Sequence, residues 1–157
     1  MASQTTSTTK WLSDVQQRAW RGWIDASRGI QAAIDRQLKA DTGFTGDDYE
    51  VLVRLSEAPD HRLRMTDLAA EIINSPSRLS QRVDRLVRDG VVRRSRCAED
   101  GRVWWAELTA EGFSRLEAAA PGHVDEVRRI FIDRLSDEEV AFLADVMPRL
   151  AQQDETA

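Results

Sequence analysis

The sequence has very little cysteine and no long apolar run. Its one cysteine, Cys97, excludes an intrachain disulfide, and this scarcity favours a reducing, cytoplasmic setting. No apolar stretch approaches the roughly 20 residues that a membrane-spanning helix needs. The two histidines, His61 and His123, lie far apart, so no metal-ligand spacing is present and we expect neither a metal nor a cofactor.

Sequence motifs of enzymes are missing as well. The chain carries no glycine-rich phosphate loop, no nucleophile elbow and no His-Glu-x-x-His pair. The first ten residues are rich in serine and threonine and have no apolar core, which predicts a disordered tail and not a secretory signal. We therefore expect a protein that is not an enzyme, with a single domain over residues 11–157.

Charge is unevenly distributed along the chain. The 157 residues carry a net charge of −5, which by itself argues against a nucleic-acid partner. Between residues 75 and 102, however, eight arginines and four acidic residues give +4, whereas 14 basic and 23 acidic residues elsewhere give −9. Such a basic segment suits either phosphate binding or a solvated, salt-bridged helix face, and charge alone does not decide between them.

The apolar pattern predicts a mainly α-helical fold with one small β-hairpin. Helical spacing indicates a long first helix from residue 11 to about 39 and a second from about 46 to 57. Shorter helices follow at about 65–73 and 76–89, and strand-like segments at 91–94 and 103–108 form the hairpin. Thr109 begins another helix, which Pro121 should kink or break, and a capping box at Ser136 opens the last one.

A short helix, a tight turn, a second helix and a hairpin follow one another in the order of a winged helix-turn-helix. Asn74 and Ser75 supply cap oxygens for the second helix, and Gly90 is placed to end it. One apolar stripe predicts the buried face of this helix: Leu79, Val83, Leu86 and Val87. Of the pair Trp104 and Trp105 in the hairpin, one should face the core and the other either the solvent or the base of the hairpin.

The N-terminal part of such a helix enters the major groove of DNA. We therefore expect base contacts from its first turns: Ser75, Ser77, Arg78, Gln81 and Arg82. Arg102 at the hairpin tip is placed for the minor groove, with an ion pair to Asp100 as the alternative. Contacts with the phosphate backbone are predicted for a further set: Arg64, Thr66, Ser80, Arg85 and Arg96. For the later arginines of the helix, including Arg88, the alternative is a partner such as Asp84 or Asp89.

The sequence resembles the MarR family of winged helix-turn-helix regulators. The resemblance lies in the order and spacing of five blocks, at residues 67–71, 75–86, 89–94, 99–102 and 108–112. The long flanking helices match in layout, so the resemblance covers most of the chain. Gln81 departs from the family pattern, because many members carry a basic residue there, so a base preference cannot be carried over.

The resemblance implies a bacterial repressor, less often an activator, that binds a pseudo-palindromic site as a homodimer. It implies a DNA-binding lobe at about 46–112 and dimerisation helices at about 11–40 and 113–152. Release by a small, often aromatic ligand is also implied, in a pocket between lobe and dimer helices. The candidate pocket residues are Trp20, Trp23, Arg28, Tyr49 and His123. For the two tryptophans, a plain core or interface role is favoured.

One alternative function stays open at this point. A winged-helix module that contacts only other proteins would have the same order of elements, but it would need neither the basic helix flank nor Arg102. Redox sensing is not expected, because Cys97 lies in the hairpin and not in the first helix.

Overall fold

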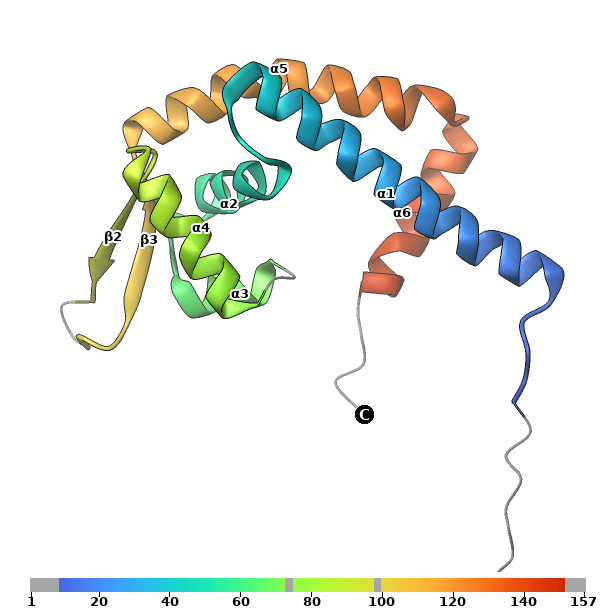
Figure 1. Cartoon of the computed structure of the whole chain (residues 1–157), viewed down its shortest axis with the longest axis horizontal. Helices are drawn as coiled ribbons and strands as arrows, with labels where there is room; N and C mark the ends of the chain where they lie inside the picture. The colour runs from blue at the N-terminus through green and yellow to red at the C-terminus, as the bar shows by residue number, and fades with distance from the viewer. Residues whose placement is uncertain (1–8, 73–74, 98–99, 152–157) are drawn as a thin grey trace, which may run out of the picture.

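Helices make up most of the molecule and one small sheet completes it, as Figure 1 shows. The computed structural model describes residues 9–72, 75–97 and 100–151. Residues 1–8 of the predicted tail, the cap residue Asn74 and residue Glu99 of the hairpin tip lie outside these ranges. The helices are α1 (Asp14–Thr42), α2 (Gly46–Glu57), α3 (Met65–Glu71), α4 (Pro76–Arg88), α5 (Ala110–Ile130) and α6 (Asp137–Ala151).

The helix termini follow their capping residues. Ser13 accepts a hydrogen bond from the backbone N–H of Gln16 at the start of α1, and Gly43 ends that helix with a φ of 78°. The predicted capping box at Ser136 is confirmed, because its hydroxyl and the Glu139 carboxylate each accept the other residue's backbone N–H. Short 3-10 turns, η1 (Pro59–His61) and η2 (Ile132–Arg134), precede β1 and α6.

One continuous hydrophobic core lies within residues 44–116, and we call this part the winged-helix lobe. The core takes residues from α2, α3, α4, the sheet, the start of α5 and the segments between them: Phe44, Val51, Leu52, Leu55, Leu68, Ile72, Leu79, Val83, Leu86, Val91, Val92, Ala106 and Leu116. Outside the lobe, α1 and α5 pack along each other and share one side of the molecule (Figure 1). Among the described residues, α1 buries only Leu38 and α6 buries none.

The sheet has three strands and not the two that the sequence predicted. Strands β2 (Val92–Arg96) and β3 (Trp104–Leu108) form the expected hairpin, and β1 (Arg62–Arg64) pairs antiparallel with the other edge of β3. The short segment Arg-Leu-Arg carries too weak a strand signal to be recognised alone. It becomes a strand because β3 offers an unpaired edge beside α2.

A second correction concerns α5, which Pro121 does not break. The helix runs without interruption from Ala110 to Ile130. Proline removes one backbone donor from a helix, and here packing of α5 against α1 and α2 supports the turns around it. The tertiary contacts therefore override the local signal.

Gly112 brings the start of α5 against the turn between α4 and β2. A Cβ atom at this position would lie 2.1 Å from the Val91 carbonyl oxygen and 2.8 Å from Leu108 Cδ1. Thr109 caps α5 by accepting from the Gly112 N–H, while its own hydroxyl donates to the Gly90 carbonyl at 2.8 Å. Only glycine permits this close approach, which holds the start of α5 against the turn that leads from α4 into β2.

Candidate nucleic-acid interface

Helix α4 presents one buried face and one exposed face, as its sequence pattern predicted. Leu79, Val83 and Leu86 are buried in the core. Val87, which the sequence assigned to the same stripe, is 37% exposed, because it lies at the edge of the stripe in the last turn. The residues opposite the stripe are all exposed: Ser77, Gln81, Asp84 and Arg88.

The N-terminal turn of α4 is held open to the outside. Ser75 caps the helix by accepting a hydrogen bond from the backbone N–H of Arg78 at 3.4 Å, so the predicted cap is confirmed. The hydroxyls of Ser75 and Ser77 lie 3.3 Å apart, and both residues are exposed. Among the described residues, no carboxylate pairs with the side chain of Arg78. These groups are therefore available to a partner outside the chain.

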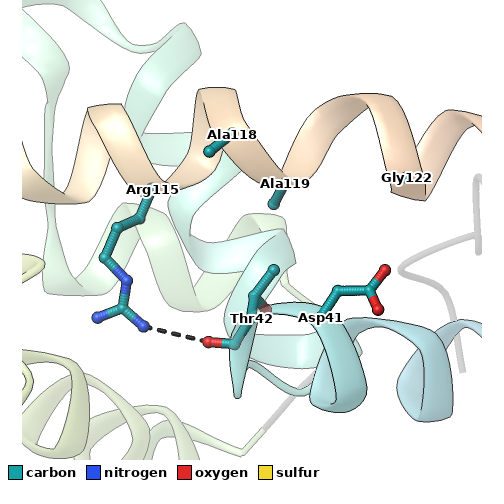
Figure 2. Close-up of a pocket in the computed structure, with 6 residues that line it drawn as sticks. All are labelled: Asp41, Thr42, Arg115, Ala118, Ala119 and Gly122. Carbon is teal, nitrogen blue, oxygen red and sulfur yellow. Dashed lines mark hydrogen bonds between the residues drawn. The ribbon is translucent and has the colours of Figure 1, made fainter.

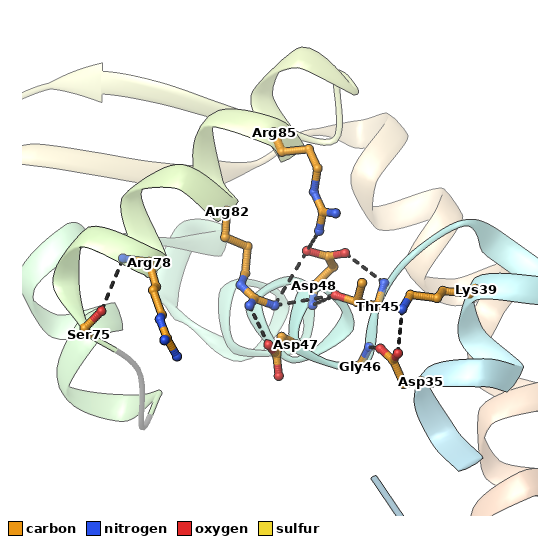
Figure 3. Close-up of polar contacts among 10 residues, drawn as sticks. All are labelled: Asp35, Lys39, Thr45, Gly46, Asp47, Asp48, Ser75, Arg78, Arg82 and Arg85. Carbon is orange, nitrogen blue, oxygen red and sulfur yellow. Dashed lines mark hydrogen bonds and ion pairs between the residues drawn. The ribbon is translucent and has the colours of Figure 1, made fainter. Parts of the chain in front are cut away.

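The next two arginines of α4 have partners inside the protein (Figure 3). Arg82 forms ion pairs with Asp47 and, at 3.8 Å, with Asp48, while Arg85 pairs with Asp48. The acceptors are thus carboxylates at the start of α2, and neither Asp84 nor Asp89 of the neighbouring sequence is among them. Burial and the like charge of Arg85 lower the pKa of Arg82.

Asp48 is the one buried charged residue of the lobe's described part, with an exposed fraction of 1%. It belongs to the capping box of α2: its carboxylate accepts the Thr45 backbone N–H at 2.8 Å, and the Thr45 hydroxyl accepts the Asp48 N–H at 3.1 Å. A buried carboxylate needs such partners. Asp48 therefore fixes α4 to the start of α2 through Arg85.

A basic depression lies along this flank of α4, and we call it the α4 hollow. Its volume is about 510 Å³. It is lined by five basic side chains, two carboxylates and two uncharged residues: Lys39, Arg78, Arg82, Arg85, Arg88, Asp35, Asp47, Thr45 and Gln81. Lys39 is paired with Asp35 at 2.6 Å, and their hydrogen bond lowers the pKa of Asp35. The predicted reading residues Arg78 and Gln81 thus border a basic surface.

The hairpin of β2 and β3, which we call the wing, carries Arg102 at its tip, as predicted. The Arg102 side chain is almost fully exposed, at 93%, and its Nε lies 3.3 Å from Asp100 Oδ1. The same oxygen accepts the Arg102 backbone N–H at 3.0 Å, and these contacts lower the pKa of Asp100. The carboxylate therefore orients the arginine at the tip without burying it.

The two faces of the wing differ in character. On the outer face, Arg62 and Arg64 lie over the Trp105 ring, with guanidinium carbons 4.9 and 5.5 Å from its centre. Glu107 on this face is bound by Arg93 and Ser95, which lower its pKa.

On the face of the buried Ala106, Trp104 lies beneath Arg96 at 4.8 Å and lines a depression with Thr66 and Ser80. Trp104 is therefore the tryptophan of the core side. It remains 39% exposed, since it lies near the wing tip.

The residues predicted for the phosphate backbone occupy different environments. Arg96 is exposed, Arg64 is exposed beside Trp105, and Thr66 is exposed at the start of α3. Ser80 is half-buried and accepts a hydrogen bond from Arg94, which also pairs with Asp84 at 2.7 Å. Arg85 is held by Asp48. The structure thus brings only part of this set to the outside.

Comparison with known proteins agrees with this geometry. A family model described as the MarR family matches residues 44–104. Over 132 residues the chain is 36% identical to the HTH-type transcriptional repressor YetL of Bacillus subtilis (strain 168), covering 82% of this chain and 78% of YetL. The chain belongs to the MarR family. It is a transcriptional regulator of that family, as its sequence blocks predicted.

Two solved structures from Streptomyces coelicolor resemble this MarR-family chain over nearly its whole length. Sco3205, a MarR family transcriptional regulator in complex with DNA, is 42% identical, with a TM-score of 0.90 and 95% of each chain covered. AbsC, another MarR family transcriptional regulator, is 39% identical, with a TM-score of 0.85 and coverage of 92% and 97%. The likeness confirms the predicted winged-helix fold with long terminal helices.

A larger cavity of about 1010 Å³ lies between α1, α2 and α5 of this MarR-family chain. Three of the predicted pocket residues line it, namely Arg28, Tyr49 and His123. The Tyr49 and His123 rings are 4.5 Å apart, and burial raises the pKa of Tyr49 and lowers that of His123. Trp20 and Trp23 do not line the cavity; they are exposed on the N-terminal half of α1.

A smaller pocket, which the sequence did not indicate, lies where α5 passes the end of α1 (Figure 2). Arg115 donates a hydrogen bond to the Thr42 carbonyl at 3.2 Å and lies 4.4 Å from the centre of the Phe44 ring. Gly122 leaves room for Asp41, whose carboxylate would be 3.2 Å from a Cβ atom there. The arginine therefore joins the C-terminal end of α1 to the lobe.

The described residues contain neither a membrane-spanning helix nor a cluster of metal ligands. In residues 9–72, 75–97 and 100–151, no helix is long and apolar enough to cross a membrane. Within the same ranges, no group of three or more histidine, cysteine or acidic residues is placed to hold a metal ion. Cys97 is half-buried just after β2, where its backbone N–H donates to the Val103 carbonyl at 2.9 Å.

Proposed function

We propose that this MarR-family regulator binds double-stranded DNA with α4 in the major groove and the wing in the adjacent minor groove. The observation that carries the proposal is the exposed first half of α4. There Ser77, Arg78 and Gln81 face outward, while Leu79 and Val83 hold the same turns against the core. Such a helix presents side chains to base edges from a rigid support.

The side chains divide into base-reading and backbone-binding groups. Arg78 suits bidentate contact with guanine and Gln81 with adenine, and the exposed Arg102 suits a narrow minor groove. Ser75 and Ser77 lie beside them at the helix start. Arg64, Thr66 and Arg96 are exposed and suit phosphate contact, whereas Ser80, Arg82 and Arg85 already have partners within the protein.

We propose further that the regulator works as a homodimer on a pseudo-palindromic operator. Large apolar side chains are exposed along the terminal helices α1 and α6 and in the segment just before α1: Trp11, Leu12, Val15, Trp20, Trp23, Phe142 and Leu150. Exposed apolar surface of this extent marks an interaction site. A two-fold dimer formed there would place two α4 helices on half-sites about one helical turn apart, ~34 Å.

A relative and the cavity support a direction of regulation and a means of its control, both of which we propose. The match to the repressor YetL supports repression. The cavity bordered by Arg28, Tyr49 and His123 supports release by a small aromatic ligand, because the rings offer a stacking surface. Arg28 lies at the same cavity without a carboxylate partner among the described residues, so an acidic group on the ligand fits it.

A titration against DNA from upstream of its own gene, repeated over a series of salt concentrations, tests the proposal. Arg78→Ala and Arg102→Ala should each weaken binding by about tenfold or more, since a good base contact contributes ~1–3 kcal/mol. Arg54→Ala, on a half-buried arginine of α2 outside the interface, is the control. If both interface variants bind as tightly as the wild type, or if binding does not depend on salt, the protein-contact module is the better description.

A further inference from the structure

The guanidinium of Arg82 is incompletely satisfied in the α4 hollow. Its Nη2 contacts the Asp47 carboxylate, but its Nη1 reaches only Thr45 Oγ1 at 3.5 Å and Asp48 Oδ1 at 3.8 Å. Its Nε is buried and has no acceptor among the described residues. A guanidinium offers five donors in a planar fork that matches the oxygens of a carboxylate or a phosphate. One carboxylate thus holds Arg82 through a single short contact.

The two adjacent carboxylates of α2 are held very differently. The Asp48 side chain is 2% exposed, is part of the α2 capping box and binds Arg85. The Asp47 side chain is 56% exposed, and Arg82 is its one ion-pair partner among the described residues. Asp48 is thus part of the fold, whereas Asp47 can leave Arg82 without disturbing the core.

We infer that the α4 hollow is a phosphate-binding site and that Asp47 occupies it in the free protein as an internal competitor for Arg82. The hollow is lined by five basic side chains, and neither Arg78 nor Arg88 has a carboxylate partner among the described residues. A phosphate that replaced Asp47 would contact Arg82 with more than one oxygen. The Asp47 carboxylate would then turn outward into solvent.

The phosphate we assign to this site is one of the DNA backbone, so the inference rests on the proposed function. The hollow adjoins the exposed face of α4 that we propose enters the major groove, because Arg78 and Gln81 line the hollow and also lie on that exposed face. A helix lying in the major groove brings its flank close to the phosphates that border the groove. A free polyphosphate has the same chemistry and is distinguished below.

The experiment compares Asp47→Asn with Glu50→Gln in the full chain bound to DNA from upstream of its gene. Both variants remove one negative charge from α2, but Glu50 lies 3.9 Å from Arg54 and does not line the hollow. Asp47→Asn should tighten DNA binding by about threefold to tenfold over Glu50→Gln, because it removes an anion that competes with phosphate. The slope of log K against log salt should become more negative by about 0.9 for one added phosphate contact.

A double variant shows whether the gain passes through Arg82. In the Arg82→Ala background, Asp47→Asn should bring no gain over Glu50→Gln. A gain that persists without Arg82, or equal affinities of Asp47→Asn and Glu50→Gln in both backgrounds, would overturn the inference. Melting temperatures of all variants show that the comparison is made between folded proteins.

A second arm without DNA identifies the source of the phosphate. Thermal melting with pyrophosphate, against chloride at equal ionic strength, reports binding of a free anion. If pyrophosphate raises the melting temperature of Asp47→Asn, and does so only when Arg82 is present, the phosphate site is supported and also accepts free anions. If Asp47→Asn increases affinity for DNA but pyrophosphate does not raise its melting temperature, the site is assigned to the DNA backbone. A failure of the proposed function gives a different result from a failure of this inference: the wild type itself would show no salt-dependent binding to DNA.

Discussion

The winged-helix lobe and the terminal helices differ in how completely each buries its own apolar surface. Every residue of the main core cluster lies in the lobe, between Phe44 and Leu116. The terminal helices leave large side chains outside: Trp20 is 58% exposed, Phe142 is 65% exposed and Leu150 is 64% exposed. The lobe thus buries its core within one chain, whereas α1 and α6 leave large apolar side chains exposed.

This difference separates the two requirements of the proposed regulator. A DNA-reading helix must be held rigidly, and the buried stripe of α4 with its ties to α2 provides that within one chain. Reading two half-sites requires two chains, and the exposed apolar side chains of the terminal helices are the surface that we propose for their contact. Substitutions in the lobe should therefore affect folding, and substitutions in the terminal helices should affect assembly.

The largest effect is expected at Gly112 in the lobe. Gly112→Ala would place a methyl group 2.1 Å from the Val91 carbonyl oxygen, which is backbone and cannot move aside alone. We expect a loss of about 3 kcal/mol in the free energy of unfolding, measured by urea denaturation. Gly101→Ala at the wing tip is the matched control, because a Cβ there meets no atom within 4 Å. Equal stability of the two variants would show that the start of α5 is not packed tightly against the Val91 carbonyl.

A somewhat smaller effect is expected at Asp48. Asp48→Ala leaves the Thr45 backbone N–H without its acceptor and removes the partner of Arg85, so we expect a loss of about 2–3 kcal/mol. The adjacent Asp47→Ala should cost about 0.5 kcal/mol, because that carboxylate is largely exposed. Chemical denaturation compares the pair directly, and a reversed order would contradict the assignment of Asp48 to the fold.

The terminal helices should respond in assembly and not in folding. Phe142→Glu puts a charge on the exposed apolar surface of α6 and should weaken the dimer by about 2–3 kcal/mol, seen by sedimentation at micromolar concentration. Phe113→Glu alters a phenylalanine of the lobe that is 42% exposed, against 65% for Phe142, and should leave the dimer unchanged. A wild-type monomer at these concentrations would count against the whole interface.

The smallest effect concerns pH. Burial holds the pKa of His123 below its ordinary value, so the folded chain takes up a proton at lower pH than the unfolded chain does. The stability from neutral His123 is therefore present above about pH 6.5 and declines as the pH falls below it. Melting temperatures between pH 7.5 and 5.5 should fall for the wild type and fall less for His123→Gln. If the melting temperatures of the wild type and of His123→Gln fall equally with pH, His123 is not the cause of the pH dependence.

The sequence predicted the parts of the structure that local patterns determine. The observed bounds of α2 agree with those predicted. The buried stripe of α4 follows from the spacing of its apolar side chains, and its two ends follow from Ser75 and Gly90. Strand β1 was missed because three residues with two arginines form a strand only beside β3. The pairing of Arg82 and Arg85 with Asp47 and Asp48 was missed because it joins residues 35 to 37 positions apart. Such contacts depend on how α2 packs on α4.

The most direct test of a dimer that reads two half-sites is the stoichiometry on DNA. Footprinting locates the protected stretch of DNA upstream of the protein's own gene. The mass of the protein–DNA complex is then measured with two duplexes, one with both half-sites intact and one with a single half-site scrambled. We predict two chains per intact duplex and a loss of about tenfold or more in affinity when one half-site is scrambled. One chain per duplex, with equal affinity for both duplexes, would contradict it.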